Sequence, residues 1–298
     1  MIVVTGAQGF LGRHLVPRLA EAGYRVLAVD RVAAQKDIPG VVNHVADLAS
    51  PAALIPPDCV GGEPFVLIHL AWNIQQRDAG YRVQAEQVAI FAALLDYWRE
   101  KGLTHLIAPG SAQEFGAKSG VLSEEAVPEE PVSPYGWAKR SAYTMAHSWS
   151  QRNSIGLTWL RPFIIYGEGQ GGDLLVPYAL RQASSGERAE FTDGKQIRDF
   201  VHISDIVEAF VLAVQRRSKT PVALNLGSRD PVSARELLEV IAGSFHARDK
   251  FVFGARARRQ TDPEMQVADC SRAEQVLGWT PKMGWREGIQ RVCGAVKK

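Results

Sequence analysis

The sequence contains little cysteine and no long apolar run. Its 298 residues include three cysteines, Cys59, Cys270 and Cys293, which are widely separated and lack metal-ligand spacing. This pattern argues against a disulfide framework or a zinc site and favours reduced thiols. No stretch approaches the roughly 20 apolar residues of a membrane helix, and the opening MIVVTGAQGFLG lacks the features of a secretory signal. We therefore expect a cytoplasmic protein with neither a bound metal nor a membrane contact.

A strong net charge is also missing. The chain carries 34 Lys and Arg against 32 Asp and Glu, for a formal net charge of +2. This balance provides no global field for nucleic acid, although a local basic cluster can still meet a phosphate. Apolar residues make up 46% of the chain, enough to bury a large core. We expect a globular protein that binds a small molecule and no nucleic acid.

Short apolar runs alternate with helical stretches through the first half of the chain. The runs IVVTG, RVLAVD, FVLIHLA and HLIAPGS are separated by segments such as HLVPRLAEAG and AIFAALLDYWREKG. This alternation predicts an α/β fold of the Rossmann type, with a doubly wound parallel sheet covered on both faces. From about residue 167 a Gly-rich loop and mixed elements follow. We predict one domain over residues 1–166 and a smaller, partly interleaved region over residues 167–298.

Three glycines follow the first predicted strand. Gly6, Gly9 and Gly12 lie in VTGAQGFLGRHL, where they permit a tight turn and bring the backbone and a helix N-terminus close to a pyrophosphate. Asp30 ends the second predicted strand, where a carboxylate can bind a ribose 2'-hydroxyl. The combination predicts a bound dinucleotide, NAD or NADP.

The residues after the second and third strands bear on which dinucleotide binds. Asp30 favours NAD because a carboxylate repels a 2'-phosphate, whereas Arg31 could turn toward such a phosphate. Asp47 and Leu48 follow the third strand and could flank the adenine. An equally good interpretation makes Asp47 a loop cap.

The segment SPYGWAKRSAY predicts a helix with chemistry on one face. Ser133 is a good N-cap and Pro134 suits the first turn, so Tyr135 and Lys139 should lie one above the other. A tyrosine with a pKa near 10 needs a neighbouring positive charge to act as a base at neutral pH. Ser111 ends the strand HLIAPGS, at the sheet edge where ligands bind. The alternatives are a surface stripe on the helix and a simple turn at Ser111.

Several motifs together resemble a known family. The chain is similar to the extended short-chain dehydrogenase/reductase family, the NAD-dependent epimerase/dehydratase group that acts on nucleoside-diphosphate sugars. The resemblance covers nearly the whole chain and rests on TGAQGFLG, GSAQEFG, the Tyr135–Lys139 pair, LRPFIIYGEGQ, DGKQIRDFVHISDIVEAF and VADCSRAEQVLGWTP.

The resemblance implies roles for named residues. Tyr135 would be the general acid and base, Lys139 would lower its pKa and hold the nicotinamide ribose, and Ser111 would bind the substrate oxygen. Residues 1–166 would bind NAD(P) and residues 167–298 mainly the sugar nucleotide. Further cofactor contacts would come from Phe10, Leu11, Leu70, Ala71 and Pro162.

The resemblance also implies arginines for the diphosphate. Arg198 in IRDF would meet it, and Arg258 or Arg259 in GARARRQTD resembles a second such arginine. Each could instead be a solvated surface charge. For Asp205 and Trp279 we expect structural roles, at a helix start and in packing of the tail.

The chain departs from the family pattern at a few positions. Dehydratases carry an Asp-Glu pair where this chain has Ala112 and Gln113, which disfavours dehydration. Ile164 and Gln87 each replace a common asparagine, so substrate contacts at Ile164 do not carry over.

Two reactions remain, and one non-enzyme function. The short length and the tail favour a 4-ketoreductase of an NDP-4-keto-6-deoxyhexose, with an NDP-sugar 4-epimerase as the alternative. Regulators that only sense the cofactor typically lose the tyrosine or the lysine, and both are present here. The family also implies a homodimer through the helices around residues 88–100 and 135–150.

Overall fold

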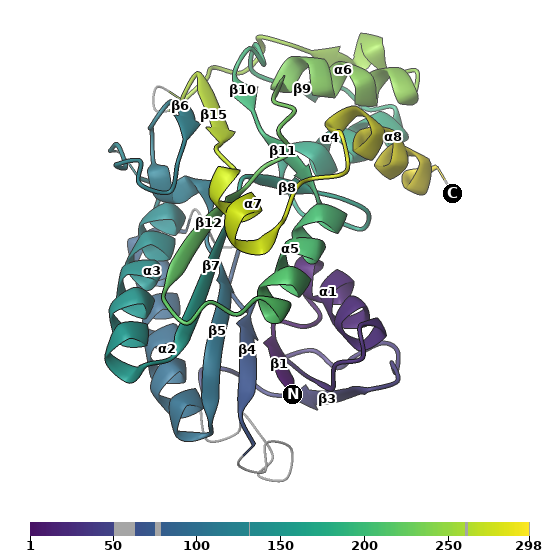
Figure 1. Ribbon diagram of the computed structural model, residues 1–298. Helices are drawn as coiled ribbons and strands as arrows, with labels where there is room; N and C mark the ends of the chain where they lie inside the picture. The colour runs from purple at the N-terminus through teal and green to yellow at the C-terminus, as the bar shows by residue number, and fades with distance from the viewer. Residues whose placement is uncertain (51–62, 75–78, 131, 260–261, 298) are drawn as a thin grey trace.

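A seven-stranded parallel sheet forms the centre of the molecule (Figure 1). The computed structural model describes residues 1–50, 63–74, 79–130, 132–259 and 262–297, so Cys59 lies outside the described residues. The strands are ordered β12-β7-β5-β4-β1-β2-β3. Their bounds are β1 (Ile2–Thr5), β2 (Val26–Asp30), β3 (Val41–Val45), β4 (Phe65–His69), β5 (Leu103–Pro109), β7 (Gly156–Pro162) and β12 (Val222–Leu226). The predicted doubly wound α/β fold is confirmed, and the strand order reverses between β1 and β4.

Helices cover both faces of this sheet (Figure 1). Successive strand residues point to opposite faces, so Ile2 and Val4 pack in one core while Val3 packs in the other. The first core includes residues of α1 (Phe10–Glu21) and α5 (Ile203–Gln215), and the second includes residues of α2 (Tyr81–Glu100) and α3 (Pro134–Asn153). The continuous burial of β1, β4 and β7 follows from this two-sided cover.

Smaller sheets and helices form a second layer beyond the carboxyl edge of the large sheet (Figure 1). A four-stranded sheet is ordered β13-β10-β15-β6, and β8 pairs with β11 and β14 with β9. The strands are β6 (Gly120–Leu122), β8 (Ile164–Tyr166), β9 (Ala189–Glu190), β10 (Ile197–Arg198), β11 (Phe200–His202), β13 (Val232–Ser233), β14 (Phe251–Val252) and β15 (Met265–Ala268). The helices of this layer are α4 (Leu175–Ser185), α6 (Ala234–Ser244) and α8 (Trp285–Val296), with the short 3-10 helix η4 (Arg248–Lys250). Helix α7 (Ser271–Leu277) and the 3-10 helix η3 (Ala112–Phe115) instead contribute buried residues to the first core. Strand β6, which precedes residue 166, joins the four-stranded sheet beside β15. Strand β12, which follows residue 166, joins the large sheet beside β7, so each part of the chain adds a strand to the other part's sheet.

The C-terminal segment is fastened to the first turn of α5. The Trp279 indole donates to the Asp205 carbonyl oxygen at 2.8 Å, and the Met283 amide donates to the Asp205 carboxylate at 3.0 Å. These contacts agree with the structural roles expected for Asp205 and Trp279. Cys270 and Cys293 are buried free thiols, and burial raises the pKa of Cys270 to about 12, so it stays a thiol. In the described part of the chain no helix is long and apolar enough to cross a bilayer.

Candidate active site

The glycine-rich turn between β1 and α1 brings three backbone segments together. Gly6 has a φ of 72°, and a Cβ there would lie 2.6 Å from the Ala71 amide nitrogen after β4. A Cβ at Gly12 would collide with the Gly6 carbonyl oxygen. Gly9 is the N-cap of α1, which begins with Phe10 and Leu11. A side chain at Gly6 or Gly12 would therefore collide with the backbone, so glycine permits the close packing that a dinucleotide-binding turn needs.

Asp30 links this turn to the end of β2. Its carboxylate accepts the Gln8 amide at 2.8 Å and the Val32 amide at 3.1 Å. A carboxylate offers about four acceptor positions, so two bonds leave it able to accept from a ribose hydroxyl. Arg31 is exposed beside it.

The other predicted cofactor residues also follow strands of the large sheet. Leu70 and Ala71 come directly after β4, and Pro162 ends β7 opposite Leu226. Asp47 follows β3, and its carboxylate accepts the Ala49 amide at 3.0 Å, as in the loop-cap interpretation. Leu48 packs against the core beneath α2 and α3. The carboxyl ends of parallel strands share one edge, so these residues follow the same edge as Gly6.

Ser111 caps the short helix η3 just after β5. Its hydroxyl oxygen accepts the Gln113 amide at 3.1 Å, and its own amide donates to the Glu114 carboxylate at 2.9 Å. This is the reciprocal capping box that the spacing Ser-x-x-Glu favours. The turn is therefore fixed by its own sequence.

Glu114 also connects this turn to β7, which the sequence analysis did not foresee. Its carboxylate accepts the Trp159 indole N–H at 2.9 Å and pairs with the Arg161 guanidinium at 2.8 Å. Both charged side chains are buried, at 2% and 7% exposure. A buried pair is tolerated when hydrogen bonds satisfy it, as they do here. The sequence signals were the Ser-x-x-Glu spacing and an arginine inside the apolar strand TWLRPF.

The N-terminus of α3 packs directly on η3. The Ser133 hydroxyl accepts the Gly136 amide at 3.0 Å and donates to the Gln113 side-chain oxygen at 2.7 Å. A Cβ on Gly136 would collide with the Gln113 carbonyl oxygen, so glycine permits the close approach. These contacts bring the helix turn of Tyr135 to the turn of Ser111. Gln113 occupies the position of an acidic residue in dehydratases, and here its side chain connects η3 to the N-terminus of α3.

Lys139 lies one turn beyond Tyr135, and both side chains are buried. The Lys139 ammonium donates to the Pro109 carbonyl oxygen at 3.0 Å and lies 5.8 Å from the centre of the Tyr135 ring. Burial lowers the pKa of Lys139 to about 7, and the Glu114 carboxylate opposes that shift. Ser111, Tyr135 and Lys139 thus gather where β5 ends, and the surface-stripe alternative does not fit this burial.

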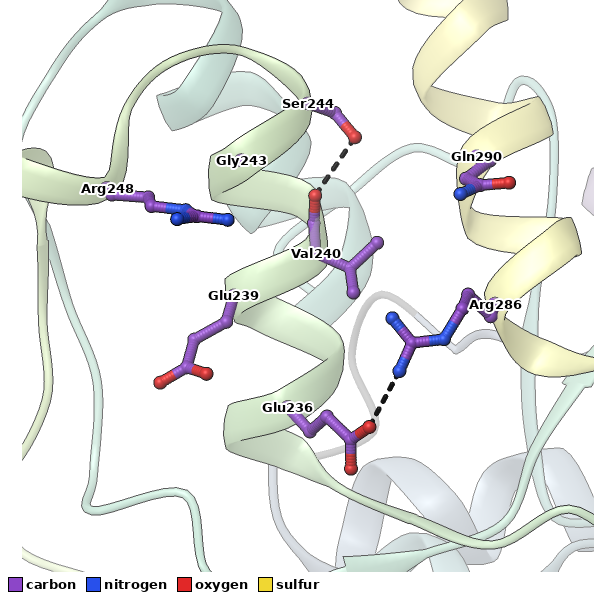
Figure 2. Close-up of a pocket in the computed structure, with 8 residues that line it drawn as sticks. All are labelled: Glu236, Glu239, Val240, Gly243, Ser244, Arg248, Arg286 and Gln290. Carbon is purple, nitrogen blue, oxygen red and sulfur yellow. Dashed lines mark hydrogen bonds and ion pairs between the residues drawn. The ribbon is translucent and has the colours of Figure 1, made fainter.

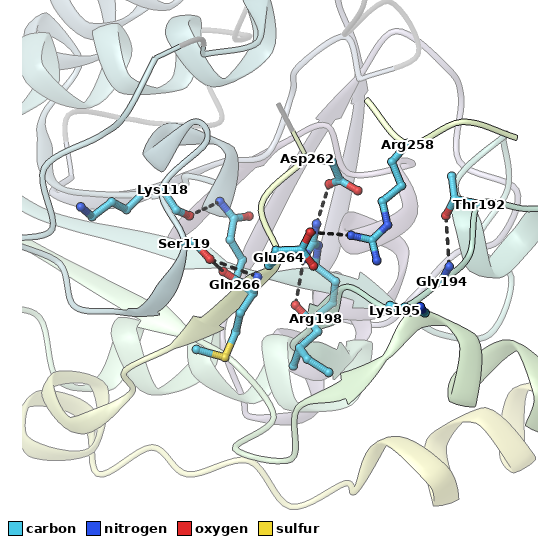
Figure 3. A network of polar contacts seen from close by, with 12 residues as sticks. Lys118, Ser119, Thr192, Gly194, Lys195, Arg198, Arg258, Asp262, Glu264 and Gln266 are labelled. Atoms are coloured by element: carbon cyan, nitrogen blue, oxygen red, sulfur yellow. Dashed lines mark hydrogen bonds and ion pairs between the residues drawn. The ribbon is translucent and has the colours of Figure 1, made fainter. Parts of the chain in front are cut away.

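Two of the predicted phosphate arginines, Arg198 and Arg258, lie close to acidic side chains, as Figure 3 shows. Arg198, on β10, is buried and pairs with Asp262 at 2.5 Å. Arg258 pairs with Asp193 at 2.5 Å and Glu264 at 2.8 Å, whereas Arg259 is exposed. Burial lowers the pKa of Arg198, which Asp262 opposes. Arg198 and Arg258 therefore share one network with acidic partners, which the sequence did not predict.

A groove lies between α6 and α8, as Figure 2 shows. Glu236 and Arg286 face each other across it at 2.7 Å. None of the residues predicted to bind a ligand lines this groove. It is not a candidate for the active site.

Comparison with known proteins identifies the family. The model of the NAD dependent epimerase/dehydratase family matches residues 2–227. The chain belongs to the NAD dependent epimerase/dehydratase family. The family predicted from the motifs is thereby confirmed, as is the prediction of an enzyme of this class.

Relatives of this family member align over almost its full length. It is 28% identical to the UDP-glucose 4-epimerase of Streptococcus mutans serotype c, across 94% of this chain and 92% of the relative. It is 22% identical to the CDP-abequose synthase of Salmonella typhimurium, across 98% and 96%. The solved structure of MoeE5 in complex with UDP-glucuronic acid and NAD is 31% identical, with a TM-score of 0.88 and coverage of 99% and 98%.

Proposed function

We propose that the chain is an NAD-dependent enzyme that inverts a nucleoside-diphosphate sugar at C4. The observation that carries this proposal is the buried Lys139 ammonium one turn from Tyr135, beside the capped Ser111 turn. Two relatives support the choice of reaction and substrate, one named as a UDP-glucose 4-epimerase and one solved with UDP-glucuronic acid and NAD.

The residues at the sheet edge fit the cofactor. Bound nicotinamide dinucleotide supplies reversible hydride exchange at a carbon bearing oxygen. Gly6, Gly9 and Gly12 would hold its pyrophosphate, and Asp30 its adenine ribose, which favours NAD over NADP. Further contacts would come from Phe10, Leu11, Arg31, Asp47, Leu48, Leu70, Ala71 and Pro162.

The chain's own residues would move the proton. The Tyr135 phenolate would take the proton of the sugar hydroxyl and return it after inversion, and the Lys139 ammonium would stabilise that phenolate. The Ser111 oxygen accepts one amide bond, which leaves its O–H to donate to the same sugar oxygen.

The arginine network would receive the diphosphate. Arg198 and Arg258, with Arg259 beside them, present guanidinium groups suited to phosphate oxygens. Arg198 and Arg258 now bind carboxylates, so a diphosphate would replace one anionic partner with another. The substrate would therefore span the two layers, with residues 1–166 holding mainly the cofactor and residues 167–298 mainly the nucleotide.

A second candidate reaction is reduction of an NDP-4-keto-6-deoxyhexose. The tail VFGARARRQTDPEMQVADCSRAEQVLGWTP favours it, because it resembles the tail of compact reductases of nucleotide sugars. The same Ser111, Tyr135 and Lys139 would serve, with the proton delivered once.

One assay separates the two reactions. The purified protein is incubated with UDP-glucose, UDP-glucuronic acid or an NDP-4-keto-6-deoxyhexose, with NAD or NADH as appropriate. Inversion at C4 without net change in cofactor absorbance supports the epimerase. Stoichiometric loss of NADH absorbance supports the ketoreductase, and no turnover of any substrate would contradict both.

We also propose a homodimer that pairs α2 and α3 with their copies. These helices lie side by side on one face of the sheet (Figure 1). Sedimentation equilibrium tests this proposal, since a mass of one chain at micromolar concentration would contradict it.

A further inference from the structure

An indole ring covers the buried lysine of the active site. The Lys139 ammonium nitrogen lies 3.9 Å from the centre of the Trp72 ring. Trp72 follows Leu70 and Ala71 in the segment after β4, and no motif in the sequence assigns it a role. An ammonium group within about 6 Å of an aromatic face is attracted by the negative face of the ring, most strongly for tryptophan.

Contacts with α2 fix the orientation of this ring. The Trp72 indole N–H donates to the side-chain oxygen of Gln84 at 3.0 Å. Its ring makes an edge contact with Phe91, with the centroids 6.5 Å apart. Gln84 and Phe91 are themselves buried on α2. The ring face is thus held over the ammonium by a buried part of the fold.

The other groups around Lys139 give the ammonium limited support. Burial lowers the pKa of Lys139 to about 7, and Glu114, on η3, opposes this while paired with Arg161. His69, at the end of β4, has its pKa lowered to about 3 by burial and by Lys139, so it is neutral. Tyr135, on α3, also faces the ammonium, with its ring centre 5.8 Å away. The charged and neutral forms of Lys139 therefore have similar free energies near neutral pH, so the attraction of an aromatic face can change their populations.

We propose that Trp72 is a positioning residue for Lys139: its indole face keeps the ammonium charged and holds it one helical turn from Tyr135. The inference rests on the proposed function, in which this charge stabilises the Tyr135 phenolate. Losing the ring would release the proton of Lys139 at lower pH. Turnover needs charged Lys139, so it falls as the pH rises through the lysine pKa. Without the ring, this alkaline fall would begin at a lower pH.

The first experiment measures Lys139 itself, in protein without cofactor or substrate. Lysine labelled with ¹³C at Cε is followed by NMR against pH, and the Lys139 signal is assigned by its loss in Lys139→Met. In Trp72→Leu we expect the titration midpoint to fall by about one pH unit or more, and in Trp72→Phe by less. Trp149→Leu is the matched control, because Trp149 lies at the far end of α3 and its indole N–H also donates to a side chain, Asp96, at 3.0 Å. An unchanged midpoint in folded Trp72→Leu would overturn the proposal.

Fluorinated tryptophan gives a second measurement that leaves the fold intact. Fluorine withdraws electron density from the ring face with little change in volume, so the Lys139 midpoint should fall stepwise from tryptophan to mono- and difluorotryptophan. A midpoint independent of fluorination would overturn the proposal even if Trp72→Leu failed to fold.

Turnover then separates this inference from the proposed function. The alkaline limb of the pH–rate profile should shift in Trp72→Leu by the same amount as the NMR midpoint, and not in Trp149→Leu. A lower rate with an unshifted limb would assign Trp72 a merely structural role and overturn the inference. Absence of turnover in every protein would contradict the proposed function, while the NMR titration would still decide the role of Trp72.

Discussion

The proposed catalytic edge, with Lys139, and the arginine network, with Arg198 and Arg258, differ in what holds their positive charges in place. Lys139 is buried, donates to the Pro109 carbonyl oxygen and lies against the Trp72 ring, which is itself bonded to the buried Gln84 of α2. Arg258 is bound by the carboxylates of Asp193 and Glu264, which are 39% and 77% exposed. The first site is therefore set before a ligand arrives, whereas the second must exchange partners to bind one. This difference fits the proposed function, in which a fixed group would transfer a proton while the arginines would bind and release a diphosphate.

The largest expected effect removes the proton carrier from the fixed site. Tyr135→Phe keeps the ring and its packing but deletes the hydroxyl. We expect turnover to fall by roughly 10²–10⁴-fold or below detection, since general acid–base catalysis is worth about that much. NAD affinity, measured by calorimetry, should be nearly unchanged. Retained turnover would remove Tyr135 from the mechanism, and lost NAD affinity would show that the change had damaged the site.

The second prediction tests whether the buried ion pair beside Lys139 stabilises the fold more than an exposed ion pair does. Glu114→Gln leaves Arg161 without its carboxylate in a buried position, so the free energy of unfolding should fall by roughly 3–5 kcal/mol. Glu129→Gln is the control, because Glu129 pairs with Lys118 at 2.6 Å on an exposed part of the chain. An exposed pair of this kind contributes about 0–1 kcal/mol. Equal midpoints of urea unfolding for the two variants would contradict the comparison.

The sequence predicted relations between residues that are close together in the chain. Tyr135 and Lys139 were found because their relation is local: an N-cap, a proline and a four-residue spacing place them on one helix face. The capping box of Ser111 and Glu114 is local in the same way. The doubly wound α/β fold followed from the alternation of apolar runs and helices, whereas the order of the strands came only from the structure.

Local sequence patterns did not predict contacts between segments that are distant in the chain. Glu114 meets Arg161 only because β5 lies beside β7, and Trp72 meets Lys139 only because the segment after β4 reaches α3. The choice between Arg258 and Arg259 depended on the register of a loop. In the structure Arg258 enters the acidic network and Arg259 is exposed, but their roles toward a diphosphate stay a prediction.

The third prediction sharpens the comparison within the arginine network. Arg198 is buried and Arg258 is more exposed, so the two should contribute differently to the affinity for a diphosphate. A charged hydrogen bond in a desolvated site is worth about 1.5–3 kcal/mol, which predicts a loss of UDP affinity of roughly 10–100-fold in Arg198→Gln. The loss in Arg258→Gln should be smaller because solvent screens the exposed pair. Calorimetric titration with UDP measures both, and the reverse order would show that burial does not set their contributions.

The smallest expected effect concerns the choice of cofactor at the fixed edge. The Gln8 and Val32 amides donate to different oxygens of the Asp30 carboxylate, so Asp30→Asn keeps an acceptor for only one of them, and it removes the charge that would repel a 2'-phosphate. We expect the affinity for NAD to fall a few-fold and the preference for NAD over NADP to shrink by roughly tenfold, about 1.4 kcal/mol. The measured quantity is the ratio of the two dissociation constants within each protein, so any general loosening of the phosphate turn cancels. An unchanged ratio would mean that Asp30 serves only to tie the turn to β2, and that the cofactor preference must come from another residue near the adenine ribose, with Arg31→Ala as the next variant to compare.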